Sequence, residues 1–125
     1  MAAKVVDASA LGALLFGEPE AEIVADRLEG ADLVAPALLD FEIASVCLKK
    51  IRRNPKQRDA VLAAFAIYRR MTIAITPIDH PEALLLAEAH GLSSYDAAYL
   101  WLARYLSAEL VTLDKRLRAV ESTRH

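Results

Sequence analysis

Four acidic residues lie far apart along this chain, each in a setting that could aim its side chain at a single point. Asp7 and Asp114 each end an apolar run with the pattern of a buried strand. Glu42 lies inside a helical pattern, and Asp96 lies at the start of another helix. Carboxylates gathered at one point repel one another unless protons or cations intervene, and a hard divalent cation with oxygen ligands is a natural counterion. The sequence therefore predicts an acidic metal-binding site.

Three of these acids also have purely structural interpretations, which the sequence leaves open. Asp7 is a residue type common in turns after strands. Asp114 could simply cap the N-terminus of a helix over residues 115–118. Ser93 followed three residues later by Asp96 matches a capping box. Each position taken alone is a weak signal, and capping is the stronger interpretation of Asp96.

Glu42 is less easily explained as a surface residue. Helix geometry of about 100° per residue places Leu38, Phe41 and Glu42 within about a third of a turn of one another. A carboxylate beside such an apolar stripe is unusual unless it binds a ligand or is paired. Asp40 lies about 200° around the same helix from Glu42, so the two cannot face one site. Asp40 is therefore expected in solvent or near the helix start.

The other residues that could carry chemistry have simpler roles. Asp79 and Glu82, with Pro81 between them, are interpreted as capping residues of one helix. The three histidines lack metal-ligand spacing, and the four scattered glycines form no phosphate-binding loop. The single Cys47 cannot form an internal disulfide and is expected to be a small buried residue. Four aromatic residues of the late helix are interpreted as core and interface residues: Tyr95, Tyr99, Trp101 and Tyr105.

Positive charge is concentrated at one helix end and the turn that follows it. The residues concerned are Lys49, Lys50, Arg52, Arg53, Lys56 and Arg58. One interpretation is a solvated face whose charges complement the helix dipole. The other is a set of phosphate contacts with a nucleic acid. The net charge of −2 for the whole chain does not decide between them.

Strands and helices are expected to alternate along the chain. The strands are predicted near residues 4–7, 32–35, 72–75 and 110–113. The helices are predicted from Ser9, from near Pro19 to Gly30, from Pro36 to about Arg53, from Pro55 to Arg70, from Pro81 to His90, from Ser93 to about Ser107, and after Asp114. This alternation favours a parallel sheet with right-handed crossovers, whose ligands bind beyond the carboxyl ends of the strands. The sequence leaves open whether residues 120–125 add an edge strand.

Length and composition indicate one domain, residues 1–125, with a substantial core. The apolar fraction of 55% suits a sheet covered on both faces and favours a homodimer or another protein partner. No apolar stretch reaches the length of a bilayer span, and the start of the chain lacks the layout of a signal peptide. We therefore expect a cytoplasmic protein with no membrane association.

Taken together and in order, four short motifs resemble those of the PIN-domain nucleases. The resemblance is greatest to the VapC-type ribonuclease toxins of prokaryotic toxin–antitoxin pairs, and it spans essentially the whole chain. The matching segments are residues 5–9 (VVDAS), 36–42 (PALLDFE), 94–99 (SYDAAY) and 112–114 (TLD). Relatives usually continue into a further strand after the last acid, whereas little of this chain remains there.

The resemblance implies a fold and a set of site residues. The fold is a three-layer α/β/α domain around a parallel sheet of four or five strands. The catalytic and metal-binding carboxylates fall on Asp7, Glu42, Asp96 and Asp114. The hydroxyls of the family fall on Ser9 and Thr112, which are candidates to orient the acids. The RNA backbone would be held by Lys49, Lys50, Arg52, Arg53 and Lys56.

The function implied is that of an Mg²⁺- or Mn²⁺-dependent endoribonuclease, the toxin of a type II toxin–antitoxin pair. Its partners would be a VapB-like antitoxin, which wraps a groove between helices, an RNA substrate, and a second copy of the chain. Two alternatives remain open: a metal- or RNA-binding module without turnover, and a housekeeping nuclease of the same fold. A phosphatase or a receiver domain is disfavoured, because Ser9 stands where the former needs a second Asp and the latter's paired acids are missing.

Overall fold

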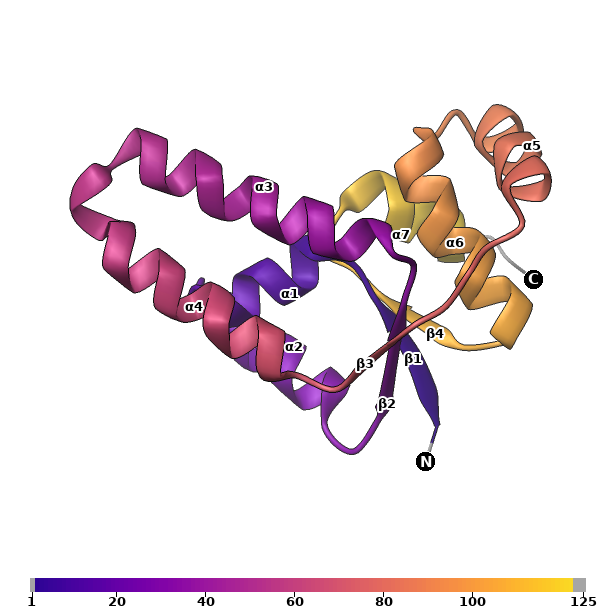
Figure 1. Cartoon of the computed structure of the whole chain (residues 1–125). Helices are drawn as coiled ribbons and strands as arrows, with labels where there is room; N and C mark the ends of the chain where they lie inside the picture. Colours follow the sequence, from indigo (N-terminus) through magenta and orange to yellow (C-terminus); the bar gives the residue numbers. More distant parts are fainter. Residues whose placement is uncertain (1, 123–125) are drawn as a thin grey trace.

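The central layer of the molecule is a parallel sheet of four short strands (Figure 1). The computed structural model describes residues 2–122. The strands are β1 (Ala3–Val6), β2 (Asp32–Ala35), β3 (Ile73–Ile75) and β4 (Glu109–Val111). Their spatial order is β3-β2-β1-β4, so β1 and β4, the first and last strands of the chain, lie side by side. The carboxyl ends of all four strands therefore point to one edge.

Helices cover both faces of this sheet. The elements between and after the strands are α1 (Ala8–Leu15), α2 (Ala21–Leu28), α3 (Leu38–Arg53), the 3₁₀ turn η1 (Pro55–Gln57), α4 (Arg58–Arg70), α5 (His80–His90), α6 (Ser94–Leu106) and α7 (Lys115–Ser122). Figure 1 shows α3 and α4 as a long helical pair extending beyond the sheet, with α5 and α6 on the opposite side. The expected three-layer α/β/α architecture is confirmed.

Each face of the sheet has its own apolar core because alternate strand residues point to opposite faces. Val6, Ala35 and Val111 pack with the buried residues of α1 to α4. Val5 and Leu110 pack instead with α6 and α7. The strands are buried on both faces, which explains why they read as unbroken apolar runs in the sequence.

Local signals set most of the helix boundaries. Asp79 caps α5 through the backbone N–H of Glu82, at 3.0 Å. Gly91 ends the same helix in the left-handed conformation, with φ of 64°. Asn54 separates α3 from the turn η1, where Pro55 cannot continue the backbone ladder. These caps explain why the predicted boundaries lie within a few residues of the observed ones.

Three expectations need correction or qualification. The last strand is shorter than predicted: it ends at Val111, and Thr112 and Leu113 lie in the loop that follows. The predicted helix over residues 55–70 is divided into η1 and α4. Residues 120–122 belong to α7 and not to an edge strand, while residues 123–125 lie outside the described part of the chain. Within residues 2–122, no helix is both long and apolar enough to span a membrane.

Candidate active site

The adjacent ends of β1 and β4 position the first acid of the site. Asp7 directly follows β1, and its backbone N–H donates to Val111 of β4 at 3.2 Å. Its side chain is only 5% exposed and caps α1 by accepting from the backbone N–H of Ala10 at 3.0 Å. Asp7 is therefore both a capping residue after a strand and a buried carboxylate. A buried charge of this kind needs partners, and the neighbouring loops supply them.

Two hydroxyl groups fix the orientation of the Asp7 carboxylate. The Ser9 hydroxyl donates to Oδ1 at 2.7 Å, and the Thr112 hydroxyl donates a short hydrogen bond to Oδ2. Ser9 also accepts from the backbone N–H of Leu113 at 2.9 Å, and Thr112 accepts from that of Asp114 at 3.0 Å. Ser9 and Thr112 therefore hold the loop after β4 against the end of β1.

Asp114 is a helix cap, as its structural interpretation predicted. Its Oδ1 atom accepts from the backbone N–H of Leu117 at 2.9 Å, at the start of α7. The cap fixes one oxygen and leaves the carboxylate beside the end of β4. Arg118 reinforces this turn by donating from Nη2 to the Thr112 carbonyl at 3.0 Å. Capping and membership of the acidic site are thus compatible at this position.

Glu42 is held at the sheet edge by a tyrosine from another helix. Its Oε1 atom accepts a hydrogen bond from the Tyr99 hydroxyl at 2.6 Å, and this bond links α3 to α6. The apolar stripe predicted beside Glu42 is wrong, because Phe41 is 75% exposed. The buried face of α3 instead contains Leu39 and Ile43, and Glu42 borders that face. The neighbours predicted for Glu42 were therefore wrong in part, and its role in the site stays a prediction.

Asp40 points away from the site, as helix geometry required. It accepts a hydrogen bond from the Tyr68 hydroxyl at 2.5 Å and forms an ion pair with Arg69 at 3.6 Å. The expectation that Asp40 lies near the start of the helix is confirmed, and its side chain is partly exposed. Asp40 ties the first turn of α3 to α4.

Asp96 occupies the first turn of α6, beside its capping residue. The Ser93 hydroxyl accepts from the backbone N–H of Asp96 at 3.0 Å, so the predicted cap is present. The Asp96 side chain is only partly exposed. Burial raises the pKa of Asp96, and the charge of Arg116 of α7 partly opposes that rise. Arg116 also donates to the Gly91 carbonyl at 3.3 Å.

Electrostatic coupling shows that the tertiary structure gathers the four acids. Burial raises the pKa of Asp7, Glu42 and Asp96. The charge of Asp114 further raises the pKa values of Asp7 and Asp96. The charges of Asp7 and Asp96 raise the pKa of Glu42 in the same way. Side chains from two strand ends and two helices therefore share one negative potential, which a bound cation would relieve.

The donor set suits a hard divalent cation in its chemistry. All four groups are carboxylates, the ligand type that Mg²⁺ and Mn²⁺ prefer. Within residues 2–122, however, no three His, Cys, Asp or Glu side chains lie close enough together to hold a metal ion as they stand. Hydrogen bonds to Tyr99 and to the α7 backbone hold Glu42 and Asp114 in their observed orientations.

A groove between α1 and α3 leads from the acidic site to part of the basic cluster. The groove has a volume of about 440 Å³, and Ser9 and Leu113 line its end near the acids. Three of the predicted RNA-binding residues also line it: Lys49, Lys50 and Arg53. Lys50 lies 4.6 Å from the centre of the Phe16 ring and 3.8 Å from a carboxylate oxygen of Glu18. Arg52 and Lys56 are exposed but do not line this groove.

The sequence interpretation missed the role of Tyr99. It assigned this residue to the core, and the structure does bury it, but its hydroxyl also reaches an acid of the site. The available signal was the spacing, since Tyr99 follows Asp96 by three residues and helix geometry places both on one side of α6. The arginines of α7 were missed as well, because nothing local distinguishes them from surface charges. The burial of Cys47 is confirmed.

Comparison with known proteins agrees with this geometry. A model of the PIN domain family matches residues 4–122. VapC ribonuclease Mb0985 of Mycobacterium bovis is 35% identical over 115 residues, which cover 90% of this chain and 87% of that protein. Ribonuclease VapC3 of Pyrobaculum aerophilum is 31% identical over 123 residues, with 90% of each protein covered.

Two solved structures share the fold at lower identity. PAE2754 from Pyrobaculum aerophilum superposes with a TM-score of 0.66 at 24% identity, covering 94% of this chain and 84% of that one. Mycobacterium tuberculosis VapC20, described as a Sarcin-Ricin loop cleaving toxin, gives a TM-score of 0.67 at 18% identity, with 94% of each chain covered. From these matches together, the chain belongs to the PIN domain family and, within it, to the VapC proteins.

Proposed function

We propose that this protein is a divalent-metal-dependent endoribonuclease that acts as the toxin of a type II toxin–antitoxin pair. The observation that carries the proposal is the convergence of four acids at the carboxyl edge of the sheet, where the charge of Asp114 raises the pKa values of Asp7 and Asp96 and the charges of those two raise the pKa of Glu42. Relatives at 31% and 35% identity are named VapC ribonucleases, which supports RNA as the substrate. The site of action would be the cytoplasm.

Each acid has a distinct part in the proposed mechanism. Bound Mg²⁺ or Mn²⁺ would supply an activated water and neutralise charge on the scissile phosphate. Asp7 and Asp114 would be direct ligands. The hydroxyls of Ser9 and Thr112 orient the Asp7 carboxylate, and the backbone N–H of Leu117 holds one oxygen of Asp114. Asp96 would bind the metal directly or through a water molecule. Glu42 would either complete the ligand set or orient the attacking water.

Metal removal tests the catalytic part of the proposal. Purified protein incubated with a mixed RNA pool should cleave RNA in Mg²⁺ or Mn²⁺ and lose that activity in EDTA, because the carboxylates alone cannot activate water at neutral pH. Product bands on a denaturing gel measure the effect, and restoring Mn²⁺ after EDTA serves as the control. Equal cleavage with and without EDTA would eliminate the metal mechanism. Absence of cleavage in every RNA pool would favour a module without turnover.

The groove between α1 and α3 is the proposed track for the RNA backbone. Its basic side chains can neutralise phosphates that approach the acidic site, and its end at Ser9 brings a bound strand to the acids. Single-stranded regions are the preferred substrates, because duplex RNA hides its base edges.

Neutralising the groove should weaken RNA binding in a salt-dependent way. In a double variant with Lys49→Gln and Arg53→Gln, the slope of log K against log salt should flatten by about 1.4, at about 0.7 per lost single-strand phosphate contact. The matched control changes Arg52→Gln and Lys56→Gln, which removes the same charge outside the groove. Fluorescence anisotropy with a labelled single strand measures both. A slope in the groove variant equal to that of the wild type would return the cluster to the role of a solvated face.

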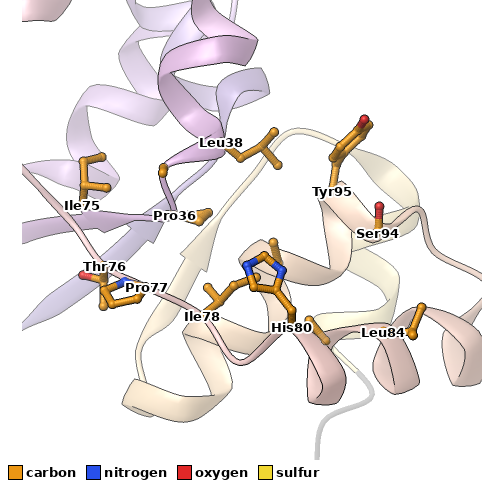
Figure 2. A pocket seen from close by; sticks show the side chains of 13 residues that line it. Pro36, Leu38, Ile75, Thr76, Pro77, Ile78, His80, Leu84, Ser94 and Tyr95 are labelled. Atoms are coloured by element: carbon orange, nitrogen blue, oxygen red, sulfur yellow. The ribbon is translucent and has the colours of Figure 1, made fainter.

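We further infer a homodimer that buries apolar surface around α5. A second cavity, of about 890 Å³, lies between the start of α3, the segment after β3, α5 and α6 (Figure 2). Its lining is mainly apolar and includes Ile75, Leu84 and Tyr95, all of which are exposed. An exposed apolar surface of this kind usually marks an interaction site.

Charge introduced into this surface should break the dimer. Leu84 is 64% exposed, so Leu84→Glu should leave the single chain folded but should place a charge in the proposed interface. Light scattering after gel filtration should give about twice 13.7 kDa for the wild type and 13.7 kDa for the variant. Glu88→Gln, on the same helix but outside the cavity lining, is the control. A wild-type protein with the mass of one chain would contradict the inference.

A further inference from the structure

One buried hydroxyl group connects the two helical layers at the acidic site. Tyr99 belongs to the core on the α6 face of the sheet and is 1% exposed, unlike Tyr95 and Tyr105 on the same helix. Its hydroxyl donates to Oε1 of Glu42 at 2.6 Å, and Glu42 stands on α3, a helix of the opposite layer. The bond therefore joins elements that only the folded sheet brings together.

The chemistry of this pair suits orientation and not proton transfer. The Tyr99 hydroxyl is the donor of this bond, and the Glu42 carboxylate is the acceptor. A carboxylate has no proton to donate, so the phenol hydroxyl supplies the one in the bond. Because Oε1 is hydrogen-bonded to Tyr99, rotation of the Glu42 carboxylate is restricted. Hydrogen bonds from neighbouring residues orient metal ligands in the same way.

We propose that Tyr99 is a positioning residue of the acidic site, whose hydroxyl fixes the orientation of Glu42, one of its four carboxylates. The inference rests on the proposed function, because it assigns to Tyr99 an effect on metal binding. It predicts that removal of the hydroxyl oxygen of Tyr99 weakens the metal affinity of the free protein.

The chain itself supplies a matched control. Tyr68 is 4% exposed, and its hydroxyl donates to Asp40 at 2.5 Å in the same turn of α3 that carries Glu42. The two tyrosine–carboxylate bonds are alike in chemistry and burial. They differ in direction, because Asp40 faces α4 and Arg69 and not the acids of the site. Loss of the Tyr68 hydroxyl should therefore lower the stability of the fold without changing metal affinity.

The experiment compares Tyr99→Phe with Tyr68→Phe. Mn²⁺ binding to the purified free protein is measured by the electron paramagnetic resonance signal of unbound Mn²⁺, and thermal unfolding is measured in EDTA. Tyr99→Phe should weaken Mn²⁺ binding by about 10-fold or more, the usual effect of losing an outer partner of a metal ligand. Tyr68→Phe should bind Mn²⁺ as the wild type does, although both variants lose a buried hydrogen bond. Equal Mn²⁺ affinity in the wild type and Tyr99→Phe would overturn the inference.

A double-mutant cycle tests whether Tyr99 acts through Glu42. If it does, Tyr99→Phe should cause no further loss of Mn²⁺ affinity in a protein that already contains Glu42→Gln, because residues in one network are not additive. A full further loss would overturn the positioning role. If Tyr99→Phe does not fold, Glu42→Asp provides the second test, since it keeps the tyrosine and the charge but withdraws the carboxylate by one methylene. Wild-type affinity in Glu42→Asp would also contradict a requirement for a fixed Glu42.

The controls separate this inference from the proposed function. If the wild-type protein binds no Mn²⁺ and cleaves no RNA, the proposed function fails and the positioning role fails with it. If the wild type binds Mn²⁺ and cleaves RNA while Tyr99→Phe equals it in both, only the role of Tyr99 is overturned. Metal-dependent cleavage with a selective loss of Mn²⁺ affinity in Tyr99→Phe supports both.

Discussion

The Asp7→Asn protein is expected to fold normally and to lose at least about 100-fold of its RNA cleavage rate. Loss of a residue that hydrogen-bonds to a metal ligand reduces activity by up to about 100-fold. Asp7 is proposed to contact the metal itself, so its loss should reduce the rate at least as much. The fold should survive because Asn can keep the main bonds of Asp7. Its Oδ1 atom can accept from Ser9 and Ala10, and its amide can donate to Thr112 with the direction of that bond reversed.

The same substitution should stabilise the metal-free protein at neutral pH. Burial raises the pKa of Asp7 in the folded state above its ordinary value of 3.8. A raised carboxyl pKa contributes stability that is present below the ordinary value and is lost as the pH rises through the raised value. Asn does not titrate, so the gain in Tm over the wild type should be largest near pH 7 and should vanish below about pH 4. Each kcal/mol gained raises Tm by about 4 °C in a domain of this size.

Asp79→Asn is the matched control for Asp7→Asn. Asp79 also caps a helix through a backbone N–H, but it lies outside the acidic site, and Asn is an equally good cap. Its cleavage rate should equal that of the wild type, and its Tm at pH 7 should change little. Calorimetry in EDTA and initial cleavage rates in Mn²⁺ measure the two effects. Full activity in Asp7→Asn would show that Asp7 is only a turn and cap residue.

Expression of this chain alone should arrest bacterial growth, and co-expression of its antitoxin should relieve the arrest. An unrestrained ribonuclease destroys RNA that the cell needs, and the negative potential of the site invites a Lys or Arg from the partner to occupy it. The test is colony counts after induction of the chain, with and without the product of the neighbouring short reading frame. The inactive Asp7→Asn protein should be harmless although it accumulates to the same level.

Three outcomes are informative for the toxin role. Arrest that requires Asp7 and is relieved by the neighbour supports it. Arrest that persists in Asp7→Asn would trace the toxicity to binding and not to cleavage. Harmless expression of a folded, Mn²⁺-binding and RNA-cleaving protein would instead identify a housekeeping nuclease of the same fold.

Local sequence determined the elements and their order. Apolar β-branched runs alternating with capped helical patterns specify strands and helices through near neighbours alone, and the parallel sheet follows from that alternation. The end of α5 at Gly91 and the break before η1 at Pro55 needed no tertiary information. Asp7 and Asp114 could be placed at one edge in advance, because the carboxyl ends of parallel strands share an edge.

Tertiary structure decided which side chains meet. The sequence could not show that Phe41 lies exposed while Glu42 turns to Tyr99, because the partner stands 57 residues away on the opposite layer. It could not separate the groove-lining Lys49 and Arg53 from Arg52, since that distinction depends on how α1 packs beside α3. Helix caps depend on contacts within a few residues, and the strands follow from local apolar runs. The electrostatic repulsion among the four acids arises only when burial of the core brings distant segments together.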